Sequence, residues 1–240
     1  MTLRVEQDGD RRILTLDRPE KANALSAELV EALIAAVTEA QAAGVQVLAL
    51  RGAGRNFSAG FDFGGFEDQG EDGLVERFVR IETLLQQVAR LPCVTVALAH
   101  GRNFGAGVDL FGACRWRVAT PGSTFRMPGL GFGLVLGTRR FAAIVGRERA
   151  REILEGLVTF DAGRAHDIGF VTRLAPEDAW AAVLDEAAAT SRAIPAASRA
   201  MLYRALEGGT DEADMADLVR SASVPGLKDR IRAYLAKPKS

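Results

Sequence analysis

Two glycine-rich segments carry the residue types that could do chemistry in this chain. The first covers residues 57–62 (FSAGFD) and the second covers residues 101–109 (GRNFGAGVD); each directly follows an apolar run typical of a buried strand. A glycine-rich turn between a strand and a helix exposes backbone N–H groups that can bind an anion or a developing oxyanion. Two such turns on neighbouring strands could direct one N–H each at a single carbonyl oxygen. The pattern therefore indicates stabilisation of an enolate or a tetrahedral intermediate.

Each turn alone also has a plainer explanation, because glycine commonly follows a strand. The second turn spaces its glycines as G-x-x-x-G-x-G, which differs from the dinucleotide-binding pattern G-x-G-x-x-G. The two cysteines, Cys93 and Cys114, and the two histidines show no metal-ligand spacing, so we expect neither a metal site nor a disulfide framework. The two turns together, rather than either one alone, indicate a site that could stabilise an oxyanion.

The elements that must position these turns alternate between strands and helices. The predicted strands lie at residues 3–6, 12–16, 45–50, 94–99 and 116–119. Between them, Ser26 can cap a helix that ends near Gly44, and a second amphipathic helix precedes the strand at 94. Such alternation indicates parallel βα units. From residue 138 onward one helix follows another, so we expect an α/β core over residues 1–175 and a helical region over residues 176–240.

The composition is that of an ordinary globular chain with balanced charge. Of the 240 residues, 48% are hydrophobic, and 30 Lys and Arg residues are matched by 31 Asp and Glu residues. This balance gives no electrostatic signature for nucleic acid, and groups such as Arg139-Arg140 are expected to be solvated. No apolar run approaches the ~20 residues of a membrane span, and the first residues lack the apolar core of a signal peptide. We expect a cytoplasmic protein without nucleic-acid or membrane partners.

With three further segments, the two turns resemble the crotonase superfamily, the enoyl-CoA hydratase/isomerase group. The further segments are residues 16–25 (LDRPEKANAL), 159–171 (TFDAGRAHDIGFV) and 226–235 (GLKDRIRAYL). The resemblance implies a ββα-superhelix core and an acyl-CoA thioester substrate, with coenzyme A as part of the substrate and no separate cofactor. It also implies a homotrimer or a dimer of trimers, with the helical region serving in trimerisation or as a lid.

The resemblance assigns roles to individual residues. The oxyanion hole is expected to use the backbone N–H groups of Phe61 and Ala106. Arg18 and Lys21, in the first signature, are expected to contact coenzyme A phosphates. The remaining residues expected to bind the substrate or its coenzyme are Ala59, Gly60, Asp62, Phe63, Gly105 and Gly129.

The chain departs from the family pattern at the two positions where hydratases carry glutamates. The first position is Asp109, whose side chain is shorter by one methylene, and the second is Gly129. Adding water across a double bond needs a base for the water and an acid for the α-carbon. We therefore expect Asp109 to act as the single acid or base, with a pKa raised by the desolvated acyl pocket.

Three functions stay open on this basis. The chain could be an enoyl-CoA hydratase-like lyase, a one-base member acting as isomerase, decarboxylase or hydrolase, or an acyl-CoA-binding protein without activity. Arg102 or Arg126 could bind a substrate carboxylate, although surface solvation explains them equally well. The acidic residues at 67–72 are expected to form a solvated loop. Phe61, Phe63, Phe66 and Phe132 could line an acyl pocket or belong to the core.

Overall fold

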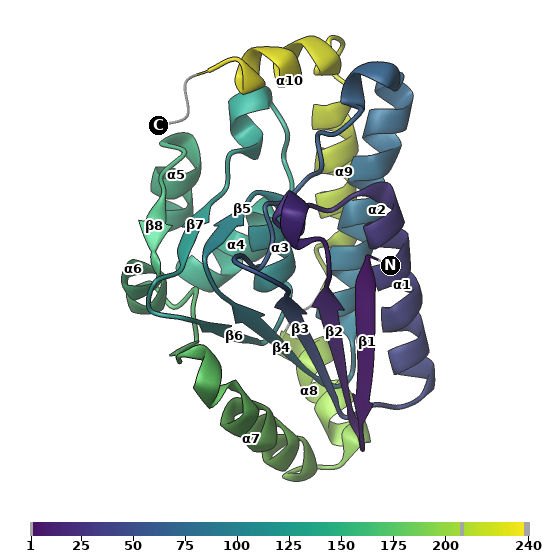
Figure 1. Ribbon diagram of the computed structural model, residues 1–240, viewed down its shortest axis with the longest axis vertical. Helices are drawn as coiled ribbons and strands as arrows, with labels where there is room; N and C mark the ends of the chain where they lie inside the picture. The colour runs from purple at the N-terminus through teal and green to yellow at the C-terminus, as the bar shows by residue number, and fades with distance from the viewer. Residues whose placement is uncertain (1, 207–208, 238–240) are drawn as a thin grey trace.

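The computed structural model describes residues 2–206 and 209–237, and a six-stranded sheet forms its centre (Figure 1). The order is β1-β2-β3-β4-β6-β9; β1 and β2 form an antiparallel hairpin and the remaining neighbours are parallel. The strands are β1 (Leu3–Asp8), β2 (Arg11–Leu16), β3 (Val47–Gly52), β4 (Val94–Ala99), β6 (Trp116–Ala119) and β9 (Arg173–Leu174). The predicted α/β class and the hairpin are confirmed.

Helices cover both faces of this sheet, which is why its central strands are apolar throughout. On one face, α1 (Ala27–Ala42) and α2 (Glu71–Arg90) pack against residues such as Leu48 and Leu50 of β3. On the other face, α7 (Trp180–Arg192) packs against the alternate residues Val47 and Ala49. The start of α1 is fixed by Ser26, whose Oγ accepts a hydrogen bond from Leu29 N at 3.2 Å, as the sequence predicts.

A second, three-stranded sheet lies beside the first and was not predicted. It is formed by β5 (Arg102–Phe104), β7 (Thr124–Arg126) and β8 (Phe160–Asp161), in that order. Strands of two or three residues are too short for an alternating pattern to show in the sequence. The short α3 (Ala106–Gly112) follows β5 directly, so this small sheet holds the second glycine-rich turn.

The remaining helices agree with the sequence to within a few residues. They are α4 (Thr138–Val145), α5 (Arg147–Glu155), α6 (Ala162–Asp167), α8 (Ala196–Leu206), α9 (Asp211–Ala222) and α10 (Leu227–Leu235), with 3-10 turns η1 (Pro19–Lys21), η2 (Phe66–Asp68), η3 (Gly129–Phe132) and η4 (Glu177–Ala179). Within the described residues, no helix is both long enough and apolar enough to span a membrane.

The acidic segment before and at the start of α2 holds α10 in place, rather than forming a wholly solvated loop. The Glu71 carboxylate accepts hydrogen bonds from the backbone N–H groups of Gly226 and Lys228 at the start of α10, at 3.3 and 3.1 Å. Glu67 pairs with Arg232 of the same helix at 2.8 Å. α10 in turn packs on η3 and lies at the top of the molecule in Figure 1. The division at residue 175 and the assembly into trimers stay predictions.

Candidate active site

The two glycine-rich turns meet backbone to backbone. Phe104 N donates to Ser58 O at 3.0 Å, which joins the second turn to the first. Gly60 has a φ of +83°, and a β-carbon there would stand 2.3 Å from Phe104 O and 3.0 Å from Ala106 N. Both the backbone conformation and the contact distance therefore require glycine at this position.

Asn23, in the first signature segment, braces the first turn. Its side chain is fully buried, and its Nδ2 donates to Ala53 O and Asn56 O at 2.8 Å each. The backbone carbonyl oxygen of Asn23 accepts a hydrogen bond from Ser58 Oγ at 2.9 Å. The sequence pattern predicts roles for the charged residues of this segment but gives no sign that the Asn23 amide is buried.

The N–H groups of Phe61 and Ala106 are left free by this arrangement. The backbone N–H of Leu25 donates to Gly60 O at 2.7 Å, and its carbonyl oxygen accepts from Asp62 N at 3.3 Å. These two bonds flank Phe61 as in a parallel bridge, so the Phe61 N–H faces away from Leu25. Ala106 is the first residue of α3, where an N–H has no intrahelical acceptor. Within the described residues, neither N–H donates to another backbone group.

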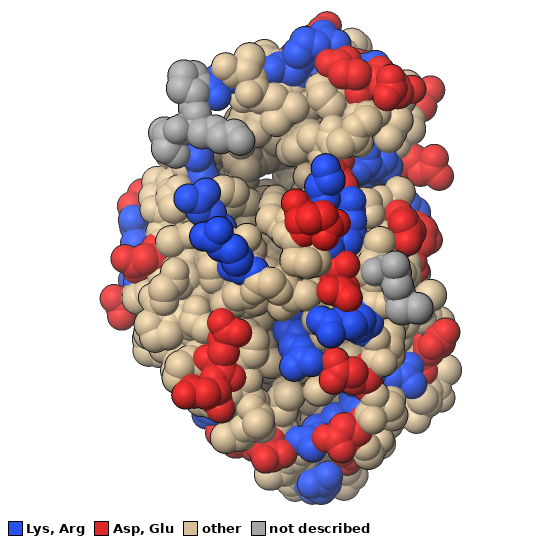
Figure 2. Space-filling view, viewed as in Figure 1, with Lys and Arg blue, Asp and Glu red and all other residues tan. Residues whose placement is uncertain are grey.

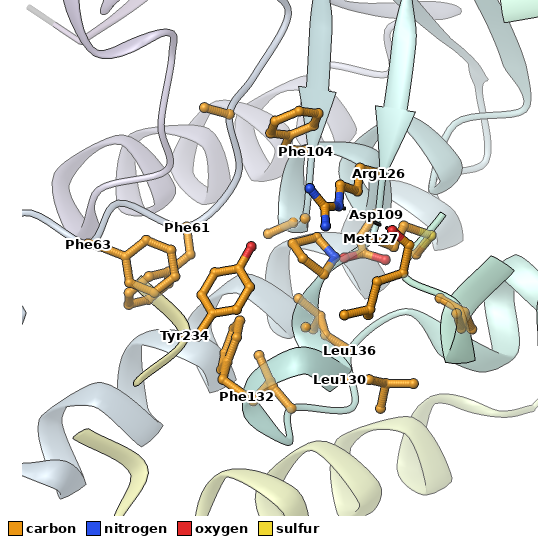
Figure 3. Close-up of a pocket in the computed structure, with 18 of the residues that line it drawn as sticks. Phe61, Phe63, Phe104, Asp109, Arg126, Met127, Leu130, Phe132, Leu136 and Tyr234 are labelled. Carbon is orange, nitrogen blue, oxygen red and sulfur yellow. Dashed lines mark hydrogen bonds between the residues drawn. The ribbon is translucent and has the colours of Figure 1, made fainter. Parts of the chain in front are cut away.

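A cavity of about 670 Å³ opens beside these two N–H groups. Figure 3 shows Phe61, Phe63, Phe132 and Tyr234 on one side of it and Asp109, Arg126 and Met127 on the other. Of the residues expected to bind or react, those that line the cavity are Ala59, Phe61, Phe63, Gly105, Ala106, Asp109 and Gly129. Those outside its lining are Arg18, Lys21, Gly60 and Asp62, and among the aromatic residues considered Phe66 also lies outside it.

Arg18 forms an ion pair with Asp62, the last residue of the first turn. Arg18 Nη1 donates to Asp62 Oδ2 at 2.8 Å and to Ala24 O at 2.7 Å, and both charged side chains are mostly buried. Partial burial works against ionisation of Asp62, but the N–H of Gly64 and the Arg18 guanidinium outweigh it and lower the pKa of Asp62. Lys21 is exposed. A phosphate contact by Arg18 or Lys21 stays a prediction.

Asp109 lies in the first turn of α3, with its side chain almost completely buried at the cavity wall. Its Oδ1 has no hydrogen-bond partner in the described part of the chain. Burial raises the pKa of Asp109 well above its usual range; the nearby Arg140 opposes this effect and Glu82 adds to it. Burial therefore shifts Asp109 toward its neutral, protonated form relative to an exposed aspartate, and a protonated carboxyl is suited to donate a proton.

Behind Asp109, a buried ion pair joins α4 to α2, and its presence corrects the expectation that Arg139-Arg140 is solvated. Arg139 is exposed, but the Arg140 side chain turns inward and is only 14% exposed, with its Nη2 3.3 Å from Oε1 of Glu82. Glu82 is 1% exposed and also accepts from Gln86 Nε2 at 3.0 Å. Burial raises the pKa of Glu82, although Arg140 and Gln86 work against that rise. An apolar helix pattern around position 82 gives no sign of this carboxylate.

Comparison with known proteins agrees with the geometry. The sequence model of the family described as enoyl-CoA hydratase/isomerase matches residues 12–221. The chain belongs to the enoyl-CoA hydratase/isomerase family. A crystal structure described as a candidate enoyl-CoA hydratase/isomerase from Bordetella parapertussis superimposes with a TM-score of 0.98 at 56% identity, covering 99% of this chain and all of that one. An enoyl-CoA hydratase from Bacillus halodurans, at 22% identity and a TM-score of 0.85, covers 97% of this chain and 100% of its own and shows the same crotonase fold.

Curated relatives differ in the reactions after which they are named. Human ethylmalonyl-CoA decarboxylase is 31% identical over 188 residues, which are 76% of this chain and 61% of that protein. A Mycobacterium tuberculosis protein named as a probable enoyl-CoA hydratase is 34% identical over 177 residues, 70% of each chain. The chain thus matches less than two thirds of the decarboxylase's length. Membership of the enoyl-CoA hydratase/isomerase family leaves the reaction open.

The described lining of the cavity holds a single carboxyl group, that of Asp109. Gly129 begins η3 and lines the cavity at the position predicted for a second glutamate, and a β-carbon there would stand 3.1 Å from Leu134 O. Among the described residues that line the cavity, Asp109 is the one with a carboxyl side chain. No other acid of the described lining replaces the missing glutamate.

Proposed function

We propose that this protein is an acyl-CoA enzyme in which the N–H groups of Phe61 and Ala106 bind a thioester enolate and Asp109 donates a proton to it. The observation that carries the proposal is the placement of one carboxyl, Asp109, in the cavity beside two free N–H groups. Ala59, Phe63, Gly105 and Gly129 would form the walls around the bound acyl and pantetheine groups.

Decarboxylation of a malonyl-type thioester is the member of this reaction class that fits a single neutral acid. Hydration needs a second acid or base, and isomerisation must begin with removal of a proton by a carboxylate. Decarboxylation generates the enolate without a base. The named activity of the decarboxylase relatives supports the same choice.

The reaction balances with the groups at hand. The bond between the α-carbon and the free carboxylate breaks, and its electron pair forms the enolate, whose oxygen is held by the Phe61 and Ala106 N–H groups. Carbon dioxide leaves. Asp109 then transfers its proton to the α-carbon and regains one from water, so one proton is consumed for each turnover.

The proposal is tested by mass spectrometry of ethylmalonyl-CoA and crotonyl-CoA incubated with the protein in deuterated water. We expect butyryl-CoA with one deuterium at the α-carbon from the first substrate and no water adduct from the second. Asp109→Asn should slow formation of deuterated product by about 10²-fold or more, which is the usual range for loss of a positioned acid.

The matched control is Asp161→Asn, the same substitution at the residue that caps α6, a role that asparagine also fills. It should leave turnover unchanged. Full activity in Asp109→Asn, or a water adduct as the main product, would refute the assignment. If every thioester in a wider panel came back unchanged, the non-catalytic acyl-CoA-binding function would replace it.

The predicted homotrimer or dimer of trimers is part of this proposal. On α8, Met201, Leu202 and Leu206 are exposed by 58%, 45% and 73%, which favours burial of this helix against another subunit. Native mass spectrometry should give a mass of three or six chains, and Leu206→Lys should reduce it. A monomeric wild-type protein would contradict the expectation.

A further inference from the structure

The small sheet presents two arginines to the cavity. β5 and β7 pair in parallel, with Arg102 opposite Thr124 and Phe104 opposite Arg126. Because alternate residues of a strand point to opposite faces, these four side chains share one face, and all four line the cavity. The intervening residue of β7, Phe125, is fully buried on the other face. The register itself therefore directs both guanidinium groups to the site.

Arg126 lacks a carboxylate partner within the described residues. The guanidinium is half-buried, and its Nε donates to Leu157 O at 3.2 Å, the single partner that the described structure gives it. Taking a cation out of water without a counter-ion costs free energy, so a group in this position favours a bound anion. Other arginines of this chain do form ion pairs with carboxylates: Arg18 pairs with Asp62 and Arg140 pairs with Glu82.

The charge of the lining points the same way. Among the described lining residues, the cationic side chains are Arg102, Arg126 and Lys237, whereas the one acidic side chain is Asp109, whose pKa is raised by burial. On the face shown in Figure 2, Lys and Arg side chains form a row over β5 and β7, beside the hollow below α10. The cavity is therefore suited to a ligand that carries negative charge.

The two arginines differ in depth. Arg126 O accepts from Gly105 N at 2.8 Å, which places this residue next to the turn that carries the Ala106 N–H, and Figure 3 shows its side chain beside Asp109. Arg102 is exposed and pairs two residues earlier along β7, about 7 Å away. A charge on the acyl group close to the thioester carbonyl would reach Arg126, whereas a coenzyme phosphate at the cavity mouth would reach Arg102.

We propose that Arg126 is the specificity residue that binds the free carboxylate of the acyl group, through its guanidinium fork. This inference rests on the proposed function and names the group by which its substrate is selected. Two parallel N–H···O bonds would hold the carboxylate and fix its rotation about the bond that breaks. Carbon dioxide is neutral, so the ion pair is lost as the bond breaks. Arg126 thus contributes to ground-state binding rather than to stabilisation of the transition state.

The test compares Arg126→Gln with the unchanged Arg126, both in an Asp109→Asn background that slows turnover, in calorimetric binding of ethylmalonyl-CoA and butyryl-CoA, which differ by the carboxylate alone. We expect Arg126→Gln to weaken ethylmalonyl-CoA binding by about 10- to 100-fold, the range for loss of a charged hydrogen-bonded pair, and to leave butyryl-CoA within about 2-fold. In turnover, KM should rise and kcat should rise with it rather than fall, because the ion pair that is lost stabilises the ground state and not the transition state. Arg126→Lys keeps the positive charge but not the guanidinium fork, so its affinity for ethylmalonyl-CoA should lie between those of the Arg126 protein and Arg126→Gln.

Arg102→Gln is the matched control and should weaken both ligands equally, as loss of a phosphate contact would. Equal weakening of both ligands by Arg126→Gln would mean that Arg126 binds the coenzyme, and unchanged binding of both would mean that it binds neither; each result overturns the inference. These binding measurements need no catalysis. A wild-type protein that prefers ethylmalonyl-CoA in an Arg126-dependent way but releases no carbon dioxide would refute the proposed reaction and support the role of Arg126.

Discussion

Gly137 and Asp109 lie so close together that a β-carbon at position 137 would stand 2.0 Å from Asp109 Oδ1. Gly137 precedes α4 and has a φ of +62°, so its backbone conformation and its contact both favour glycine. The absence of a side chain at 137 is what lets the Asp109 carboxyl occupy its buried position. The residue that shapes the proposed proton donor thus lies 28 positions away in the sequence, outside both glycine-rich turns.

Gly137→Ala should displace the Asp109 carboxyl and lower the rate of proton transfer by about 10²-fold, because a shift of about 1 Å is enough to misplace a reacting group. The left-handed backbone adds a stability loss of about 1–2 kcal/mol. Turnover and thermal unfolding are the measurements. Gly44→Ala is the matched control, since Gly44 has a φ of +66° and open space around its missing β-carbon. Equal loss of activity in both variants would show that the effect is one of general stability.

The raised pKa of Asp109 makes stability depend on pH in a defined direction. Between the pKa of an unfolded aspartate, about 3.9, and the higher folded value, the native state binds one more proton than the unfolded chain. This contribution to stability is therefore fully present below about pH 4 and is lost as the pH rises toward the folded pKa. Asp109→Asn should remove this loss, so its unfolding free energy should exceed that of wild type at pH 7 and approach it near pH 4.

Urea unfolding at several pH values checks this expectation. The control is Asp62→Asn, for which we expect the opposite dependence of stability on pH. The pKa of Asp62 is lowered, so its contribution to stability is present above the unfolded pKa and is lost as the pH falls. The Asp62 variant should therefore be less stable than wild type at pH 7. Parallel pH profiles for both variants would contradict the assigned directions.

The buried pair of Arg140 and Glu82 should show strong coupling. Arg140→Met leaves the Glu82 carboxylate buried without a cation, and we expect a loss of about 3–5 kcal/mol in unfolding free energy. Because the remaining charge causes most of that loss, Glu82→Gln added to Arg140→Met should recover at least half of it. A double-mutant cycle in urea unfolding provides the measurement. Strictly additive losses would show that the two side chains do not stabilise each other.

Glu71 should control how firmly α10 closes over the cavity, because it binds two N–H groups at the start of this helix and Tyr234 of α10 lines the cavity. Glu71→Ala should speed hydrogen exchange in α10 and raise KM by a few-fold. Glu67→Ala removes a half-exposed ion pair that solvent screens, and we expect little change in the hydrogen exchange of α10. If Glu67→Ala loosened α10 as much as Glu71→Ala, the ion pair would be the contact that holds the helix.

Much of the fold was predictable because long elements leave periodic patterns. The strand at Val94–Ala99 and the helix capped by Ser26 agree with the sequence, since a strand buried on both faces is apolar and a helix start needs a side-chain acceptor. The small sheet could not be found, because its identity depends on pairing between segments that are distant in the chain. The same applies to Gly137, whose importance is visible only once α4 is packed against α3.

The candidate site was predictable in part. The positions of Phe61, Ala106 and Asp109 beside one cavity agree with the order of the motifs, although their chemical roles stay proposals. Arg18 illustrates what a motif cannot show, since a charged residue in a signature looks the same whether it binds a ligand or, as here, an aspartate of its own chain. The sequence predicts a solvated Arg140 because nothing in the local pattern shows its partner, Glu82, which lies on a different helix.

The strict alternation along β7 also bears on how this site can change during evolution. A point substitution at Arg126 alters the acyl-facing surface and leaves Phe125 in the core, so new substrate preferences can arise at little structural risk. A one-residue insertion in the same strand would instead exchange the two, sending a cation into the core and a benzyl group into the cavity. We therefore expect natural variation here to proceed by replacement of single side chains, with the length of this segment held constant among descendants that still fold.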